Sequence, residues 1–242
     1  MPETPSSAAG KVAIVVGGGS GIGAASVREF AAHGYRVVAM SPSGRARVLA
    51  ESLGGAGLDG SNTSVEDLRA CVDLAVSRYG RIDAVVNSSG HAARGPVLEI
   101  TDEQWAEGVD LYLLNVVRMA RLVTPHLIAA GGGAIVNIST AGVFEPSAKF
   151  PVSVTMRAAL ASFTKLYATE YGPQGVRMNN LLTGLTKDDP AAVPAEWTSG
   201  IPLRRAQSTA EAARIVRFLA GEESAYMTGQ NVRVDGGETR SV

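Results

Sequence analysis

The residues with the clearest chemical potential form a glycine-rich turn near the amino terminus, GGGSGIG, from Gly17 to Gly23. The turn follows the apolar run KVAIVV and opens a segment of helical period at about Ile22. Glycines in such a turn let the backbone approach a diphosphate and direct helix-start amides toward its charge. A tight strand-to-helix turn also needs glycine for steric reasons alone, so the surrounding elements decide its meaning.

The chain around this turn alternates short apolar runs with longer segments of helical period. The runs are KVAIVV, YRVVAM, DAVVN, GAIVNI and RMNNLL, and the helical segments include ASVREFAAHG and SVEDLRACVDLAVSRYG. Strand followed by helix, repeated, predicts an α/β fold with a parallel sheet covered on both faces. Capping-box spacing predicts three helix starts, at Thr63 with Glu66, Thr101 with Gln104, and Ser208 with Glu211.

The composition is that of one large globular domain, with 242 residues of which 45% are hydrophobic and 19% charged. Lys plus Arg is 22 and Asp plus Glu is 23, which gives no electrostatic signature of nucleic acid or of an anionic membrane. No apolar run reaches the length of a membrane span. Cys71 is the only cysteine, so we interpret it as a small core residue and expect a reducing cytoplasm.

Three segments are expected along the chain: a disordered tail over residues 1–10, one domain over 11–242, and a substrate loop near 187–201 within that domain. The last segment, KDDPAAVPAEWTSGI, is rich in proline, alanine and charge and interrupts the regular alternation. A long loop in a compact domain is often a lid or a binding loop, although it can also be a plain surface connection.

Several motifs, in order, resemble those of the short-chain dehydrogenase/reductase family. GGGSGIG resembles T-G-x-x-x-G-I-G, LDGSN resembles D-V-x-D, VVNSSG resembles V-N-N-A-G, GAIVNISTAG resembles the serine-bearing fifth strand, and FLAGEESAYMTGQNVRVDGG resembles the carboxy-terminal block. The resemblance covers about Lys11 to Gly237, with Val16 where the family usually has threonine. It implies a single-domain Rossmann fold, a doubly wound parallel sheet of about seven strands flanked by helices.

The resemblance also implies a nicotinamide dinucleotide and assigns residues to it. They are Gly17, Gly19, Ser20, Gly21, Ile22 and Gly23 for the diphosphate, Asp59 for adenine, Asn87 and Gly90 for the nicotinamide-side ribose, and Arg157 and Gly184 as further contacts. Members that bind NAD usually place an acid at the end of the second strand, but this chain has Ser41, Ser43 and Arg45 there. Hydroxyls and a guanidinium suit a 2′-phosphate, so we favour NADP(H) over NAD(H). The alternative for Arg45 is a solvated residue at a helix start.

The residues that handle the proton in this family are altered. The family uses a tyrosine, a lysine one helical turn later, a serine on the preceding strand and an asparagine on the long central helix. By the resemblance, Ser153 stands at the tyrosine and Arg157 at the lysine. Arginine does not titrate near neutral pH, and a serine hydroxyl is a far weaker acid than a phenol. The serine position falls on Thr140 when counted from the strand and on Ser139 when counted back from Gly142.

With Trp105 and Pro125 as anchors, the asparagine position falls on Tyr112. The chain therefore lacks a phenol at position 153 and has one at position 112, on a neighbouring helix that faces the same pocket in the family. Our hypothesis is that Tyr112 reaches into the space left by Ser153 while Arg157 stabilises its phenolate. The alternative is that Tyr112 only fills space in a site that no longer reacts.

Other candidates are weaker. His91 follows Gly90 at the mouth of the expected cleft and could act as an acid or contact substrate, or be an ordinary loop residue. Lys165 and Tyr167 have the wrong order for the family motif, and we interpret them as surface and packing residues. His, Cys and acidic residues do not cluster at metal spacing, so no catalytic metal is expected.

Three functions remain open at this point. The favoured one is an oxidoreductase of small carbonyl or alcohol substrates with a rearranged proton donor, because the NSSG segment still resembles a nicotinamide site. The others are a cofactor-binding scaffold or sensor without redox turnover, and an enzyme of non-redox chemistry such as cyclisation or dehydration. The resemblance further implies a homotetramer or homodimer, whose contact helices, from about Asp102 to Ala130 and Val152 to Tyr171, include the apolar residues Leu111, Val116, Leu160 and Phe163. Burial against the sheet is the alternative explanation for many of these apolar residues.

Overall fold

The central sheet has seven parallel strands within residues 10–241, the part of the chain that this computed structural model describes. The expected disordered tail therefore lies, apart from Gly10, outside the described residues. In spatial order the strands are β3 (Ala56–Asp59), β2 (Arg36–Ser41), β1 (Val12–Val16), β4 (Ala84–Asn87), β5 (Gly133–Thr140), β6 (Val176–Thr183) and β9 (Asn231–Val234). The predicted α/β Rossmann fold, with about seven strands, is confirmed. The short strands β7 (Thr186–Lys187) and β8 (Gln207–Ser208) form a separate pair.

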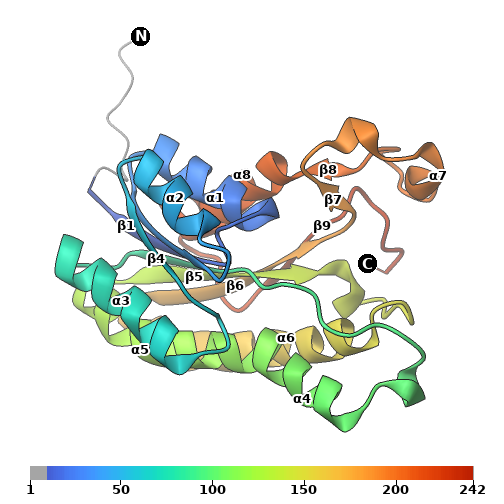
Figure 1. The fold of residues 1–242 in the computed structure, drawn as a ribbon, viewed down its shortest axis with the longest axis horizontal. Coiled ribbons are helices and arrows are strands. Elements are labelled where there is room, and N and C mark those ends of the chain that lie inside the picture. The colour runs from blue at the N-terminus through green and yellow to red at the C-terminus, as the bar shows by residue number, and fades with distance from the viewer. Residues whose placement is uncertain (1–9, 242) are drawn as a thin grey trace.

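Helices cover both faces of the sheet (Figure 1). One face carries α1 (Gly21–Ala32), α2 (Arg45–Ser52) and α8 (Thr209–Ala220), and the other carries α3 (Val65–Tyr79), α5 (Asn115–Ala129) and α6 (Pro151–Tyr171). Helix α4 (Asp102–Val109) precedes α5, and the short helix α7 (Ala195–Thr198) lies beside the β7–β8 pair. Single 3₁₀ turns occur at Val97–Glu99, Ala141–Val143, Gly172–Gln174, Pro190–Ala192 and Glu222–Ser224.

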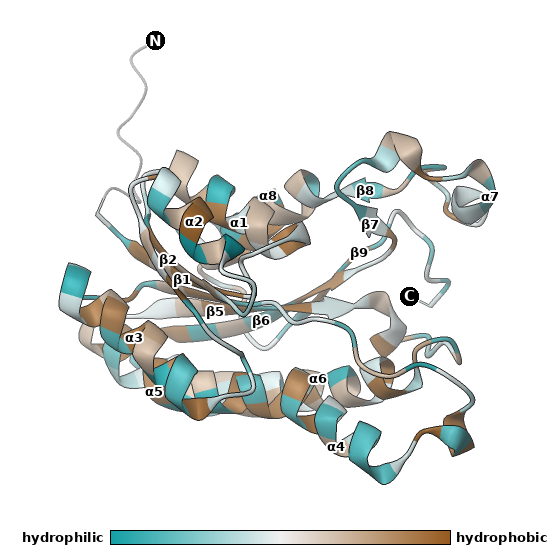
Figure 2. Ribbon diagram, viewed as in Figure 1, coloured by the Kyte–Doolittle hydropathy of each residue, from teal (hydrophilic) through white to brown (hydrophobic). Residues whose placement is uncertain are grey.

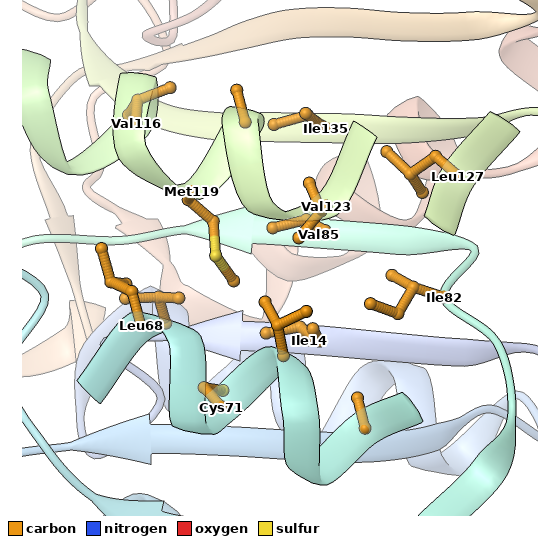
Figure 3. Close-up of a cluster of buried hydrophobic side chains, with 14 of the residues drawn as sticks. Ile14, Leu68, Cys71, Ile82, Val85, Val116, Met119, Val123, Leu127 and Ile135 are labelled. Atoms are coloured by element: carbon orange, nitrogen blue, oxygen red, sulfur yellow. The ribbon is translucent and has the colours of Figure 1, made fainter. Parts of the chain in front are cut away.

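Each face of the sheet has its own hydrophobic core, since strands buried on both sides must pack against two helical layers. In Figure 2, α3 and α5 carry both hydrophobic and hydrophilic bands, as expected for helices that cover a sheet. Figure 3 shows side chains of α3 and α5, among them Met119 and Val123, packed over Ile14 and Val85. Cys71 is fully buried in this layer, and burial raises the pKa of its thiol to about 12. Its interpretation as a core residue is confirmed.

A row of four asparagines, three buried and one half-buried, crosses four neighbouring strands. The side chain of Asn87 donates to Asn137, that of Asn137 to Asn180, and that of Asn180 to Asn231, at 2.8–2.9 Å. These residues are register partners on β4, β5, β6 and β9. Each amide therefore satisfies a polar neighbour inside the sheet, where an unpaired amide would be costly.

The helix starts show two confirmed predictions and one error. Thr101 and Ser208 form the predicted capping boxes with Gln104 and Glu211. The predicted pair of Thr63 and Glu66 is wrong, because Ser64 caps α3 by accepting the amide of Asp67 at 3.1 Å. The Thr63 hydroxyl instead bonds to that of Ser61, within the turn that precedes the helix.

The two long segments expected as helices differ in regularity. Residues 151–171 form one helix, whereas α4 and α5 are joined by a π-helical turn, Asp110–Leu114. Of the apolar residues expected to contact a second subunit, Val116 and Leu160 lie in the core instead. In the described part of the chain, no helix combines the length and the apolar character that crossing a membrane requires.

Candidate active site

A cleft of about 840 Å³ lies at the carboxyl ends of the central strands. It runs along the point where the strand order reverses, with β2 on one side of β1 and β4 on the other. Crevices at this position are where open α/β sheets bind ligands. Its walls come from Gly17, residues 19–22, 41–43, 88–91, 138–140 and 183–187 together with Gly60, Asn62, Arg94, Leu111, Tyr112, Phe150, Ser153 and Arg157.

The backbone of the glycine turn forms one wall of the cleft, and some of its positions leave no room for a side chain. Gly17 has a φ of +74°, and a Cβ on it would lie 2.3 Å from the carbonyl oxygen of Ser88. Its amide and that of Gly18 donate to the Met40 carbonyl, which fixes the turn against β2. Gly23 packs the start of α1 onto Gly17 and does not line the cleft.

The first turn of α1 is open to an anion. Ser20 is the N-cap, its side chain makes no capping hydrogen bond, and the first turn carries no acidic residue. A Cβ on Gly21 would meet no atom within 4 Å, so the space in front of these amides is free. Unpaired amides at a helix start attract phosphate, so the residues present fit a dinucleotide diphosphate.

Of the residues expected to bind the adenosine part of the cofactor, only some line the cleft. Ser41 and Ser43 line the cleft, with their hydroxyl oxygens 3.3 Å apart. Arg45 starts α2 and Asp59 forms an ion pair with Arg47 at 3.0 Å, and neither lines the cleft. Sequence reasoning missed Asn62, whose buried Nδ2 faces the cleft wall without a hydrogen-bond partner.

At the other end of the expected cofactor site, Gly90 and Gly184 line the cleft. A Cβ on Gly90 would meet no atom within 4 Å. Asn87 does not line the cleft, because its amide is bound in the asparagine row. Its position in this structure supports the sheet beneath the cleft.

The expected catalytic residues Tyr112, Ser139, Thr140, Ser153 and Arg157 all line the same cleft. Arg157 is 8% exposed, and its guanidinium lies 4.5 Å from the centre of the Tyr112 ring. It donates to the carbonyl of Ile138 and, at 3.3 Å, to the hydroxyl of Ser89. Burial lowers the pKa of Arg157, and the neighbouring Tyr112 opposes this effect.

The Tyr112 hydroxyl is bound to the backbone that follows β4. It donates to the carbonyl of Gly90 at 3.1 Å and accepts the amide of Ala92 at 2.9 Å. Tyr112 lies in the π-helical turn, a feature that occurs frequently at functional sites. Its proton can reach a molecule in the cleft only after the bond to Gly90 is released.

Two serines belong to the wall of the same cleft. Ser139 is buried near the end of β5 with no partner for its Oγ, and Ser153 lies half-buried in the first turn of α6. Thr140 instead uses its hydroxyl to accept the amide of Gly142 at 3.3 Å. Of the two candidates for the strand hydroxyl, Ser139 is the one left unbound.

His91 also lines the cleft, where burial and then the charges of Arg94, Arg157 and Lys187 lower the pKa of its imidazole. The imidazole is therefore neutral near physiological pH. Lys165 is exposed and Tyr167 is buried against Thr124, which confirms their surface and packing roles. Lys187, from the segment expected to be a loop, lines the cleft at the end of β7, and the rest of that segment contains a 3₁₀ turn and α7.

The fold and the cleft define a Rossmann-type α/β protein. A family model described as enoyl-(acyl carrier protein) reductase matches residues 16–239. The oxidoreductase UcpA of Salmonella typhimurium is 32% identical over 95% of each chain. The trans-4-hydroxycyclohexanecarboxylate dehydrogenase of Sinomonas cyclohexanicum is 33% identical over 99% of this chain and 96% of its own.

One solved structure is similar over nearly the whole length. It is a short-chain oxidoreductase from Pseudomonas aeruginosa PAO1, described as NADPH-bound and as containing an atypical catalytic centre. It superposes with a TM-score of 0.88 at 30% identity, over 96% of this chain and 98% of that one. The chain belongs to the short-chain dehydrogenase/reductase family, a family of oxidoreductases.

Proposed function

We propose that this protein is an NADP(H)-dependent oxidoreductase that acts on a carbonyl or alcohol substrate with a rearranged proton donor. The observation that carries the proposal is the continuity of the cleft. One hollow joins the open helix start at Ser20 to the cluster of Tyr112, Ser139 and Arg157. A dinucleotide bound along it would place its two ends against these two groups of residues.

The residues of the cleft fit the cofactor. The amides at the start of α1 would hold the diphosphate, Ser41 and Ser43 the 2′-phosphate, and Gly90 and Gly184 the nicotinamide side. The preference for NADP(H) is supported by these hydroxyls and by the NADPH-bound state of the solved relative. When bound, the nicotinamide supplies or accepts the hydride.

The proton is assigned to this chain's own residues. Ser153 and Arg157 stand at the family's tyrosine and lysine positions, and Tyr112 supplies the phenol from the neighbouring helix. In this assignment the Tyr112 hydroxyl leaves the Gly90 carbonyl and gives its proton to the substrate oxygen when a carbonyl is reduced, and receives the proton from that oxygen when an alcohol is oxidised. The unpartnered hydroxyl of Ser139 orients the substrate oxygen. Arg157 places its guanidinium 4.5 Å from the centre of the phenol ring and so holds the ring in position.

A second function is favoured by a specific observation. Both hydrogen bonds of the Tyr112 hydroxyl are made with backbone, and two nitrogens of Arg157 are bound to Ile138 and Ser89. Such a pair could act purely as a brace for the segment after β4. The protein would then bind the cofactor without redox turnover, as a scaffold or sensor.

Oxidation of NADPH in the presence of a panel of ketones separates the two functions. We expect turnover by the natural chain and, for Tyr112→Phe, a fall in kcat of about a hundredfold or more with NADPH affinity preserved. Tyr226→Phe, at a fully exposed position, is the matched control and should leave turnover unchanged. Unchanged turnover in Tyr112→Phe rules out its role as the acid. NADPH binding without turnover on any ketone favours the second function.

We also infer that the protein assembles as a homodimer or homotetramer through the outer sides of α5 and α6. Support comes from the exposed apolar side chains on these helices, Ile128 and Leu166. Contact with a second copy would remove these two side chains from water.

A further inference from the structure

Two cationic side chains and a neutral imidazole lie at the end of the cleft near α6 and β7. His91 and Arg94 follow β4, and Lys187 ends β7. The described residues that line the cleft include no aspartate or glutamate. Arg94 and Lys187 therefore make this end of the cleft positive, and the Glu238 carboxylate lies behind the wall, 3.2 Å from where a Cβ on Gly184 would stand.

The acids closest in sequence are occupied elsewhere. Asp188 accepts the hydroxyl of Thr209 at 3.0 Å, and Asp189 caps the turn Pro190–Ala192 by accepting an amide. Arg94 and Lys187 instead lie against aromatic rings. The guanidinium is 4.7 Å from the centre of Phe150, and the ammonium is 5.9 Å from that of Trp197.

The basic groups converge on one region. The charges of Arg94, Arg157 and Lys187 all lower the pKa of His91, so each of them is felt at the imidazole. Like charges gathered around one hollow repel each other and attract an anion. The proposed cofactor does not use them, because its phosphates are assigned to the start of α1 and to Ser41 and Ser43.

Apolar surface lies beside these charges. Phe150, Leu111 and Leu185 line the same cleft, and the Phe150 ring lies under the Arg94 guanidinium. A ligand here can place an apolar body against these side chains and a negative group against the cations. In a pocket with mostly apolar walls, a small number of polar groups fixes the orientation of the bound molecule.

We propose that the substrate carries an anionic group, a carboxylate or a phosphate, which Arg94 and Lys187 bind at this end of the cleft. This inference rests on the proposed function, since it places the reacting carbon of the same molecule beside Tyr112 and Ser139. Arg94 and Lys187 are then specificity-determining residues. A guanidinium binds either group through paired donors, and an ammonium binds it as a point charge.

Binding of small probes to the full chain with NADP⁺ present tests the anion site without turnover. Calorimetric titration compares benzoate, phenyl phosphate and the neutral benzamide. We expect one or both anions to bind at least about tenfold more tightly than benzamide. Arg94→Ala and Lys187→Ala should each remove most of the preference for the anion over benzamide. Arg69→Ala, an exposed cation on α3, is the matched control and should preserve it.

The probe that binds more tightly identifies the anionic group of the substrate. Tighter binding of benzoate indicates a carboxylate, and tighter binding of phenyl phosphate indicates a phosphate. Equal binding of all three probes, absence of anion binding, or a preference that survives both substitutions would overturn the inference. NADPH oxidation with 4-acetylbenzoate and its methyl ester separates it from the proposed function. Faster turnover of the ester overturns the anionic substrate and leaves the oxidoreductase standing. Anion binding without turnover of any carbonyl would support the anion site and contradict the proposed oxidoreductase function.

Discussion

Arg157 and Tyr112 share the centre of the cleft, and each restricts the other. The guanidinium stacks on the phenol ring while its nitrogens donate to Ile138 and Ser89. The phenol in turn binds the backbone of Gly90 and Ala92. A planar cation over a ring, combined with donors in fixed directions, is specific to arginine, because a lysine ammonium is not planar and its three donors are not held in a fork.

Replacing Arg157 by lysine therefore keeps the charge and removes the geometry. We expect Arg157→Lys to lower the free energy of unfolding by about 1–3 kcal/mol, since a buried carbonyl and the ring face lose their partner. Urea unfolding of both proteins measures this difference. Arg69→Lys, on the exposed side of α3, should change stability by less than about 0.5 kcal/mol. Equal stability of Arg157→Lys and the natural chain would contradict this stabilising role of the Arg157 guanidinium.

Among the elements, the strands were the most predictable from sequence. Five of the seven central strands coincide with the apolar runs, whereas β3 and β9 are short, only partly apolar, and were not marked by such a run. The π-helical turn around Tyr112 could not be predicted, because one extra residue in a turn changes hydrophobic periodicity very little. The start of α3 was misplaced by one residue because Thr63 and Ser64 are both good capping residues.

The start of α8 is held by a carboxylate with an unusually low pKa. Glu211 receives two hydrogen bonds from Arg205, at 2.7 and 2.8 Å, and one from the amide of Ser208. The bonds from Arg205, then that from Ser208, lower the pKa of Glu211 to about 2. The pKa of Glu211 is lower in the folded protein than in the unfolded chain. At pH values above the ordinary pKa of a glutamate, the ionised Glu211 carboxylate therefore stabilises the folded protein.

Glu211→Gln keeps the capping acceptor and removes the charge. We expect it to lower the free energy of unfolding near neutral pH by about 1 kcal/mol or less, because the pair is largely exposed to solvent. The difference from the natural chain should shrink as the pH falls from about 5 toward about 2, where Glu211 becomes protonated in both states. Urea unfolding over this range measures it. Glu107→Gln, at an exposed position on α4, should show no such trend; a constant difference for Glu211→Gln would contradict the linkage.

At the scale of the whole molecule, the site depends on contacts between distant parts of the chain. Sequence motifs predicted that the glycine turn and residues 112, 139, 153 and 157 would share one cleft, because parallel strands end at a common edge. Sequence did not predict that the Tyr112 hydroxyl would bind Gly90 and Ala92, that Asn87 would join a row of amides, or that Lys187 alone of the expected substrate loop, residues 187–201, would line the cleft. Each of these depends on a particular long-range pairing, which local patterns do not encode.

Association between copies is the property that a single chain shows least directly. Leu166, on α6, is 70% exposed although it is a large apolar side chain within a long helix. Covering a leucine stabilises an interface by about 1.5–3 kcal/mol, and a twofold interface gains this twice. A charge at the same position would have to be desolvated in both copies.

We therefore expect Leu166→Glu to shift the assembly toward smaller species while preserving the fold. Sedimentation velocity gives the mass in solution, and circular dichroism checks the folded state. Leu53→Glu is the matched control, since Leu53 is 45% exposed at the end of α2, on the other face of the sheet, and should leave the mass unchanged. A natural chain that sediments as a monomer, or a Leu166→Glu variant that keeps the mass of the natural oligomer, would show that this surface is not an interface. In the second case, association through another face would have to account for the mass.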